Sequence, residues 1–253
     1  ADEPGGDGAS LLAGGVIHKY QGRALLVATG ACAINCRYCF RRHFPYAEAS
    51  ASAGHWTAAL AYLRGDSTIH EAILSGGDPL SLNDRRLREL ADGLADIPHL
   101  RRIRVHSRLP VVLPSRIDAN LLDWLAGTRL SAVMVIHANH PNELDTGVAE
   151  ALQRLAEQGV RLYNQAVLLR GVNDDADVLE ALGERLFDLG VQPYYLHLLD
   201  RVRGAAHFEV PETEACGLMR RLAARTPGYL LPRLVREVAG EPWKVPIEWT
   251  AKG

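Results

Sequence analysis

Residues 30–46 read GACAINCRYCFRRHFPY and directly follow a short apolar run, RALLVAT (23–29). Three of the four cysteines of the chain, Cys32, Cys36 and Cys39, lie in this stretch with the spacing C-x3-C-x2-C. A short run of branched apolar residues is typical of a buried strand. Chemistry in parallel α/β folds collects at the carboxyl ends of the strands. The stretch therefore predicts a strand that delivers three thiols to one loop.

The same alternation of apolar runs and amphipathic stretches continues along the chain. Predicted strands cover 23–29, 71–77, 101–107, 131–138, 161–169 and 193–199, with a weaker seventh at 228–235. Predicted helices between them cover 55–65, 83–97, 118–127, 147–159 and 175–190. Parallel neighbours need crossovers of this length, so six strand–helix units predict an α/β fold, either an open or partial (βα)6 barrel or a doubly wound sheet.

No linker or repeat interrupts this pattern, so we expect one domain over residues 21–253 behind a loop-like N-terminal arm, residues 1–20. The 253 residues are 47% hydrophobic and carry a net charge of −2, which gives no general attraction to nucleic acid or an anionic membrane. No apolar run reaches the roughly 18 residues of a membrane span. Four unevenly placed cysteines do not form a disulfide framework, so we expect a reducing, cytoplasmic location.

Polar or glycine-containing segments follow the other predicted strands as the cysteines follow the first. Because parallel strands end at one edge of the sheet, we expect these segments to meet in one site. They are SGGDP (75–79), HSRLP (106–110), HANHPNE (137–143), LRGVND (169–174) and LDRVRGAAHF (199–208).

The three cysteines allow several interpretations. Structural zinc takes four closed ligands, and nearby His43 would have to complete the set. A redox dithiol needs only two cysteines. An iron–sulfur cubane normally takes four thiolates, so three would leave one iron open to another ligand. The residues favour the cluster, while zinc and inert thiols remain alternatives.

The spacing CxxxCxxC, with the aromatic Tyr38 before the last cysteine, resembles the radical S-adenosylmethionine (SAM) superfamily. The resemblance implies a partial (βα)6 barrel and a [4Fe-4S] cluster on Cys32, Cys36 and Cys39, whose free iron binds SAM. It also implies SAM contacts from Tyr38, from His137 after strand four, and from the glycine-rich stretch, which contains Ser75, Gly76, Gly77 and Asp78.

A narrower resemblance covers residues 14–249 and points to the lysine 2,3-aminomutase family. The matching motifs are GVIHKYQGRALL, CRYCFRRHFPYAE, SGGDPL, HSRLPVVLPSRI, HANHPNE, NQAVLLRGVND, PYYLHLLD and GEPWKVP. The likeness is greatest to the branch that makes (R)-β-lysine for modification of elongation factor P. It implies an isomerase that converts L-α-lysine to β-lysine through a 5′-deoxyadenosyl radical and 2,3-amino migration, with a flavodoxin- or ferredoxin-type reductant. An aminomutase for glutamate or arginine, a radical SAM enzyme without a second cofactor, and a non-catalytic metal or electron-transfer module are the alternatives.

The same resemblance implies a second cofactor, pyridoxal 5′-phosphate (PLP), held by Lys244 of GEPWKVP. By motif position, the PLP contacts also include Lys19, Tyr20, Arg23 and Gln165.

The resemblance assigns the substrate contacts to three further residues. Arg41 matches the residue that grips the substrate carboxylate, a task that suits the fork of a guanidinium. Asp200 and Glu237 match the positions that bind the distal ammonium of lysine. By this resemblance, the lysine-metabolising branch of the family carries aspartate where this chain has Glu237, which is one methylene longer.

Overall fold

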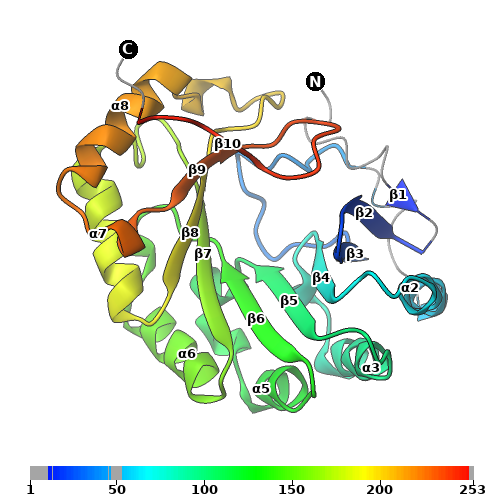
Figure 1. Ribbon diagram of the computed structural model, residues 1–253. Coiled ribbons are helices and arrows are strands. Elements are labelled where there is room, and N and C mark those ends of the chain that lie inside the picture. The colour runs from blue at the N-terminus through cyan, green and yellow to red at the C-terminus, as the bar shows by residue number, and fades with distance from the viewer. Residues whose placement is uncertain (1–10, 13, 45, 47–52, 251–253) are drawn as a thin grey trace.

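The computed structural model describes residues 11–12, 14–44, 46 and 53–250. They form one ten-stranded sheet in the order β1 to β10, which curves with its helices on the outer side (Figure 1). Seven neighbouring strands are parallel. They are β3 (Arg23–Thr29), β4 (Glu71–Gly76), β5 (Arg102–Ser107), β6 (Ser131–Ile136), β7 (Arg161–Val167), β8 (Gln192–His197) and β9 (Arg233–Arg236). The prediction of an α/β fold with a partial parallel barrel is confirmed.

Helices follow the parallel strands as crossovers, and most begin at a capped residue. Asn83, Asp118, Asp145 and Asp175 each accept a hydrogen bond from a backbone N–H of the first turn that follows. The helices are α2 (Ala53–Gly65), α3 (Asp84–Ala95), α4 (Leu109–Val112), α5 (Ala119–Ala126), α6 (Thr146–Glu157), α7 (Ala176–Asp188) and α8 (Glu212–Ala223).

The two ends of the sheet depart from the sequence-based prediction. Part of the expected loop-like arm is strand: β1 (Leu11–Leu12) and β2 (Val16–Tyr20) extend the sheet antiparallel beside β3. A turn at Gly22, where φ is +79°, allows β2 to return along β3 and to bury Val16 and Ile17. Residues 1–10 and 13 of the predicted arm lie outside the described residues.

At the other end, the weaker seventh strand is β9, whereas Gly228–Leu230 forms a 3-10 turn. A second antiparallel strand, β10 (Val245–Pro246), then pairs back onto β9. This return brings the loop before β10, which carries Lys244, to the open edge of the barrel.

The sheet separates an apolar outer layer from a polar interior. On β5, Ile103 and Val105 are fully buried in the main hydrophobic core, which also contains the apolar faces of α3, α5 and α6. Burying a leucine side chain in such a layer contributes about 1.5–3 kcal/mol. The alternate residues Arg104 and His106 face inward, as the two-residue period of a strand requires. The interior therefore carries charged and titratable side chains.

Candidate active site

A cavity of about 260 Å³ opens at the carboxyl ends of the parallel strands. Every residue that the sequence analysis assigned to a site lines it. These are Cys32, Cys36, Cys39, Tyr38, Ser75, Gly76, Gly77, Asp78, His137, Lys244, Lys19, Tyr20, Arg23, Gln165, Arg41, Asp200 and Glu237. Segments from both ends of the chain and from the middle of the sheet thus meet at one place.

The three cysteines lie together in the loop after β3, and all are free thiols. Burial, and then the nearby Asp78 and the other two thiols, raise the pKa of Cys32 to about 11. Burial likewise raises the pKa of Cys39. Three anionic sulfurs would repel one another here, so their deprotonation calls for positive charge, which the irons of a cluster supply.

Three thiols are the sulfur donors that line the cavity. Among the described residues, no three His, Cys, Asp or Glu side chains converge as the ligands of one metal ion would. In a cubane each thiolate binds a different iron, so its three cysteines need only surround a shared space. His43, the fourth ligand that a zinc site would need, is exposed and does not line the cavity.

The glycine-rich stretch after β4 packs directly on the cysteine loop. The backbone N–H groups of Gly77 and Asp78 donate to the carbonyls of Thr29 and Ala31 at 2.7 and 2.8 Å. A Cβ on Gly77 would lie 2.3 Å from the Ala31 carbonyl oxygen, and Gly76 has a φ of +119°. Both positions therefore require glycine, because a side chain would push the two loops apart.

The Asp78 carboxylate binds groups at the end of the next strand, β5. It accepts hydrogen bonds from Ser107 Oγ at 2.7 Å and from the backbone N–H groups of Arg108 and Leu80 at 2.8 and 3.1 Å. Burial raises the pKa of Asp78, and these donors oppose that shift. Asp78 thus lines the cavity while it joins the loops that follow β4 and β5.

Arg41 is buried beside the glycine-rich stretch. Its Nη1 donates to Ser75 Oγ at 3.0 Å, and its guanidinium lies 4.9 Å from the centre of the Phe40 ring. The residue retains only 9% of its exposure. A guanidinium held at this depth can bind a carboxylate strongly, because little water competes.

A second group of charges surrounds Glu237, just after β9. Lys244 Nζ donates to Glu237 Oε2 at 2.7 Å, Tyr20 Oη donates to Oε1 at 2.6 Å, and Lys19 Nζ lies 3.8 Å from Oε1. Arg23 lies over the Tyr20 ring at 4.5 Å. Burial alone would raise the pKa of Glu237, but Lys244 and its other partners hold it below the usual value.

This arrangement gathers four of the five proposed PLP contacts, Lys19, Tyr20, Arg23 and Lys244, around Glu237, whereas Gln165 lies on β7. Lys19, Arg23 and Lys244 supply three cationic groups, and the Tyr20 ring supplies a flat face, as a phosphorylated aromatic aldehyde would need. Lys244 Nζ also lies 5.9 Å from the centre of the Tyr195 ring. The residues present therefore fit the group.

Three histidines line the cavity: His197, which is buried, and His106 and His137, which are partly exposed. Burial is the main cause that lowers all three pKa values, in the case of His137 to about 4. Nε2 of each ring, and Oε1 of Gln165, are buried and have no hydrogen-bond partner in the described part of the chain. Buried polar atoms normally have partners, so these neutral groups are placed to bind a molecule in the cavity.

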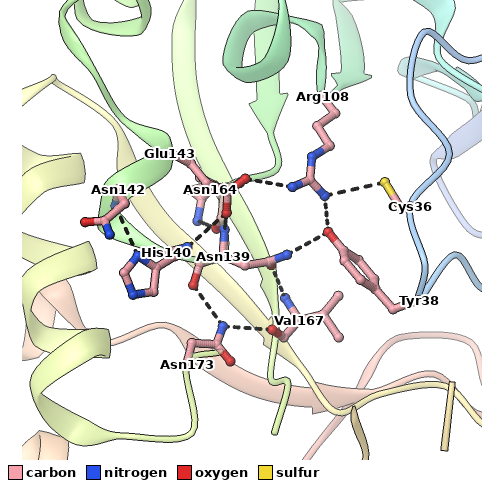
Figure 2. A network of polar contacts seen from close by, with 11 residues as sticks. Cys36, Tyr38, Arg108, Asn139, His140, Asn142, Glu143, Asn164, Val167 and Asn173 are labelled. Atoms are coloured by element: carbon pink, nitrogen blue, oxygen red, sulfur yellow. Dashed lines mark hydrogen bonds and ion pairs between the residues drawn. The ribbon is translucent and has the colours of Figure 1, made fainter. Parts of the chain in front are cut away.

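Sequence reasoning missed His106 and His197, although the signal was present. Each occupies an inward-facing position on a strand, His106 on β5 and His197 on β8. It also missed a polar network around Tyr38, in which the partners are Arg108, Asn139 and Glu143 (Figure 2). These three belong to HSRLP and HANHPNE, the segments that follow two strands.

The Tyr38 phenol is shared by two donors from different loops. Asn139 Nδ2 lies 2.6 Å from Tyr38 Oη, and Arg108 Nη1 also contacts that oxygen. Burial raises the pKa of Tyr38 to about 12. The backbone of Asn139 is in turn held by Asn173, whose Nδ2 donates to the Asn139 carbonyl at 2.9 Å. Figure 2 shows this chain of contacts running from the loop after β7 to the cysteine loop.

Comparisons with solved structures find chains of the same fold. The chain matches SuiB of Streptococcus suis with a TM-score of 0.60 and 12% identity, over 83% of this chain and 46% of that one. It matches a radical SAM methyltransferase from Sphaerobacter thermophilus with a TM-score of 0.58 and 19% identity, over 87% and 68%. These likenesses establish the fold, a partial radical SAM barrel. No protein-family model matches the chain.

Curated relatives are far more similar in sequence. The L-lysine 2,3-aminomutase of Haemophilus influenzae is 53% identical over 229 residues, which cover 90% of this chain and 68% of the relative. The enzyme of the same name from Escherichia coli is 50% identical over 92% of this chain and 68% of its own length. That of Clostridium subterminale is 37% identical over 92% and 56%. With this identity and this coverage, the chain belongs to the L-lysine 2,3-aminomutase family.

Proposed function

We propose that this chain moves the α-amino group of L-lysine to the β-carbon, with a [4Fe-4S] cluster, SAM and PLP as cofactors. The observation that carries the proposal is the single cavity, in which the three thiols, the glycine-rich stretch and Lys244 all meet. A metal-binding or electron-transfer module would need neither the glycine-rich stretch nor Lys244. The family's aminomutase name makes an isomerase the expected enzyme class.

Each absent cofactor has a defined place and task. Cys32, Cys36 and Cys39 would hold the cluster, which together with SAM would supply the carbon radical that abstracts hydrogen. Lys244 would hold PLP, which would supply the carbonyl carbon that carries the migrating nitrogen. The backbone of Gly76 and Gly77 would bind the methionine end of SAM.

The protein's own residues would bind and orient the substrate. Arg41 would bind the lysine carboxylate, and its contact with Ser75 places that carboxylate next to the glycine-rich stretch. Asp200 and Glu237 would receive the distal ammonium. The neutral His137 and Gln165 would hold hydrogen-bonding parts of the cofactors in place. This fixed placement brings the reacting carbon and the radical into contact range and excludes water.

One contact supports lysine over glutamate as the substrate. Glu237 already binds a primary ammonium, because Lys244 Nζ lies 2.7 Å from its carboxylate. The ammonium of a substrate lysine has the same chemistry. A substrate glutamate would bring a second carboxylate to Glu237, and like charges in a buried site repel.

The deciding experiment uses the full chain, purified and loaded with iron and sulfide without oxygen. It is incubated with SAM, PLP, a reductant and, in separate reactions, L-lysine, L-glutamate or L-arginine. We expect β-lysine and 5′-deoxyadenosine from lysine alone, and chiral chromatography should give the R product. A loaded sample that forms neither compound, or that rearranges glutamate or arginine faster than lysine, would contradict the proposal.

An external electron donor is part of the proposal, because the cluster must be reduced before each radical forms. Arg37 and Arg42 are exposed beside the cysteine loop, and Arg42 Nη1 donates to the Arg203 carbonyl at 2.9 Å. This basic surface suits an acidic partner of the flavodoxin or ferredoxin type. Delivery of (R)-β-lysine to elongation factor P, through its ligase, is the destination that the resemblance favours.

Among the described residues, no helix is both long and apolar enough to cross a bilayer. The three cluster thiols would stay available in a reducing cytoplasm, which we propose as the location.

A further inference from the structure

Arg108 contacts Cys36, one of the three cysteines that would bind the cluster. Its Nη1 lies 3.4 Å from Cys36 Sγ, within hydrogen-bond range for sulfur. Arg108 comes from the loop after β5, and Cys36 from the loop after β3. Figure 2 shows the guanidinium directed at the sulfur, with Tyr38 below it. The contact therefore joins two separate strand ends at the middle cysteine.

The guanidinium has little freedom to leave this sulfur. Its Nη2 forms an ion pair with Glu143 Oε2 at 2.7 Å, and the Arg108 backbone N–H donates to Asp78 Oδ2 at 2.8 Å. Glu143 is fixed through its other oxygen, which accepts the backbone N–H groups of Asn139 and His140 at 2.8 and 3.1 Å. Arg108 retains only 17% of its side-chain exposure. A side chain tied at so many points is positioned by the protein before any cofactor binds.

A fixed positive donor on a cluster sulfur has a known physical consequence. Reduction adds one electron to the cluster from the external donor, and no covalent bond forms or breaks. The added negative charge spreads onto the sulfurs, where a nearby cation and a hydrogen bond stabilise it. The reduced form gains more than the oxidised form, so the reduction potential rises.

We propose that Arg108 is a positioning residue that holds the Cys36 thiolate and raises the reduction potential of the cluster. Glu143 and Tyr38 orient its guanidinium. This inference rests on the proposed cluster at Cys32, Cys36 and Cys39, but it needs neither PLP nor lysine. It predicts that the protein eases reduction of its own cluster before SAM is cleaved.

The test is a redox titration of the loaded full chain, followed by electron paramagnetic resonance of the reduced cluster. It is run without SAM, PLP or lysine. In Arg108→Gln, we expect the equilibrium constant for one-electron reduction to fall at least tenfold, which is about 59 mV toward more negative potential. Arg108→Lys keeps the charge but lacks the fork that reaches Sγ and Glu143 together, so its shift should be smaller. Arg88→Gln, at an exposed ion pair with Asp123, is the matched control and should leave the potential unchanged.

Iron and sulfide analysis accompanies each titration, so that poor loading is not mistaken for a shift. If Arg108→Gln loads too little cluster to titrate, the shift in Arg108→Lys decides the matter. A fully loaded Arg108 variant that keeps the parent reduction potential overturns the inference. If such a variant also binds SAM more weakly, its role is to bind the cosubstrate, and the inference is overturned all the same. A parent chain that binds no cluster overturns the proposed function itself.

Discussion

Lys244 and Glu237 form a half-buried ion pair across the hairpin that ends the sheet, with Nζ 2.7 Å from Oε2. The carboxylate assigned to the substrate ammonium and the amine assigned to PLP are therefore partners in this structure. If Lys244 held PLP, its ammonium would no longer contact Glu237 Oε2, and that oxygen could accept the ammonium of a substrate. Oε1 would keep its contacts with Tyr20 and Lys19.

Substitution of Glu237 should weaken lysine binding more than it slows the reaction. A hydrogen bond to a charged group contributes about 1.5–3 kcal/mol, so Glu237→Gln should raise the KM for lysine by roughly 10- to 100-fold. Glu237→Asp, which keeps the carboxylate, should keep a KM near the parent value. Steady-state kinetics on loaded enzyme measure both. A Gln variant with unchanged KM would remove Glu237 from the substrate site.

Borohydride reduction of the PLP-loaded chain should fix the cofactor to Lys244. The chain has only three lysines, Lys19, Lys244 and Lys252, so peptide mapping by mass spectrometry is unambiguous. Lys244→Ala should lose the adduct and the β-lysine product together. Lys19→Ala should keep the adduct at Lys244 but bind PLP more weakly. An adduct on Lys19 or Lys252 in the parent would exclude the assignment.

Stability should fall as the pH is lowered below about 6.5. The folded pKa of His137 is about 4, so between pH 6.5 and 4 the unfolded chain binds a proton that the folded chain does not. Each such histidine lowers the free energy of unfolding by about 1.4 kcal/mol per pH unit in this window. Burial lowers the pKa values of His106 and His197 as well, so the slope should exceed that of one group. Urea unfolding at pH 7.5, 6 and 5 measures it, and His137→Asn should flatten the dependence.

Gly77→Ala should separate the glycine-rich stretch from the cysteine loop. The added Cβ would meet the Ala31 carbonyl oxygen at 2.3 Å, and overpacking of this kind costs about 1–3 kcal/mol. We expect a lower midpoint of thermal unfolding and less iron bound per chain. Gly228→Ala is the matched control, because a Cβ there has no neighbour within 4 Å among the described residues and its φ is not positive. Equal effects at the two positions would show that the close approach is unimportant.

The barrel was predictable because its signals are local. The run RALLVAT forms β3 with the predicted bounds, and Asp175 and Gly190 mark the start and the end region of α7 as capping rules require. The strand β2 was missed, because a five-residue strand with three half-exposed residues has no strong apolar pattern of its own. Its position depends on pairing with β3, which is a tertiary effect.

The site was predictable to the extent that its residues belong to motifs. Resemblance placed Lys244 and Cys36 in one cavity although 208 positions separate them, and the structure brings them there. It could not anticipate that Glu237 would pair with Lys244, since that contact depends on how β10 returns along β9. Nor could it anticipate the contact of Arg108 with Cys36, which depends on a guanidinium conformation set by three neighbouring loops.

The return of β10 along β9 also determines when the pocket is completed during protein synthesis. The cysteine loop leaves the ribosome early, whereas Lys244 is made only after all seven parallel strands. If the three thiols hold a cluster, they are therefore made long before Lys244, the amine that would hold the second cofactor. A nascent chain stalled before its final hairpin would carry the cysteine loop without Lys244.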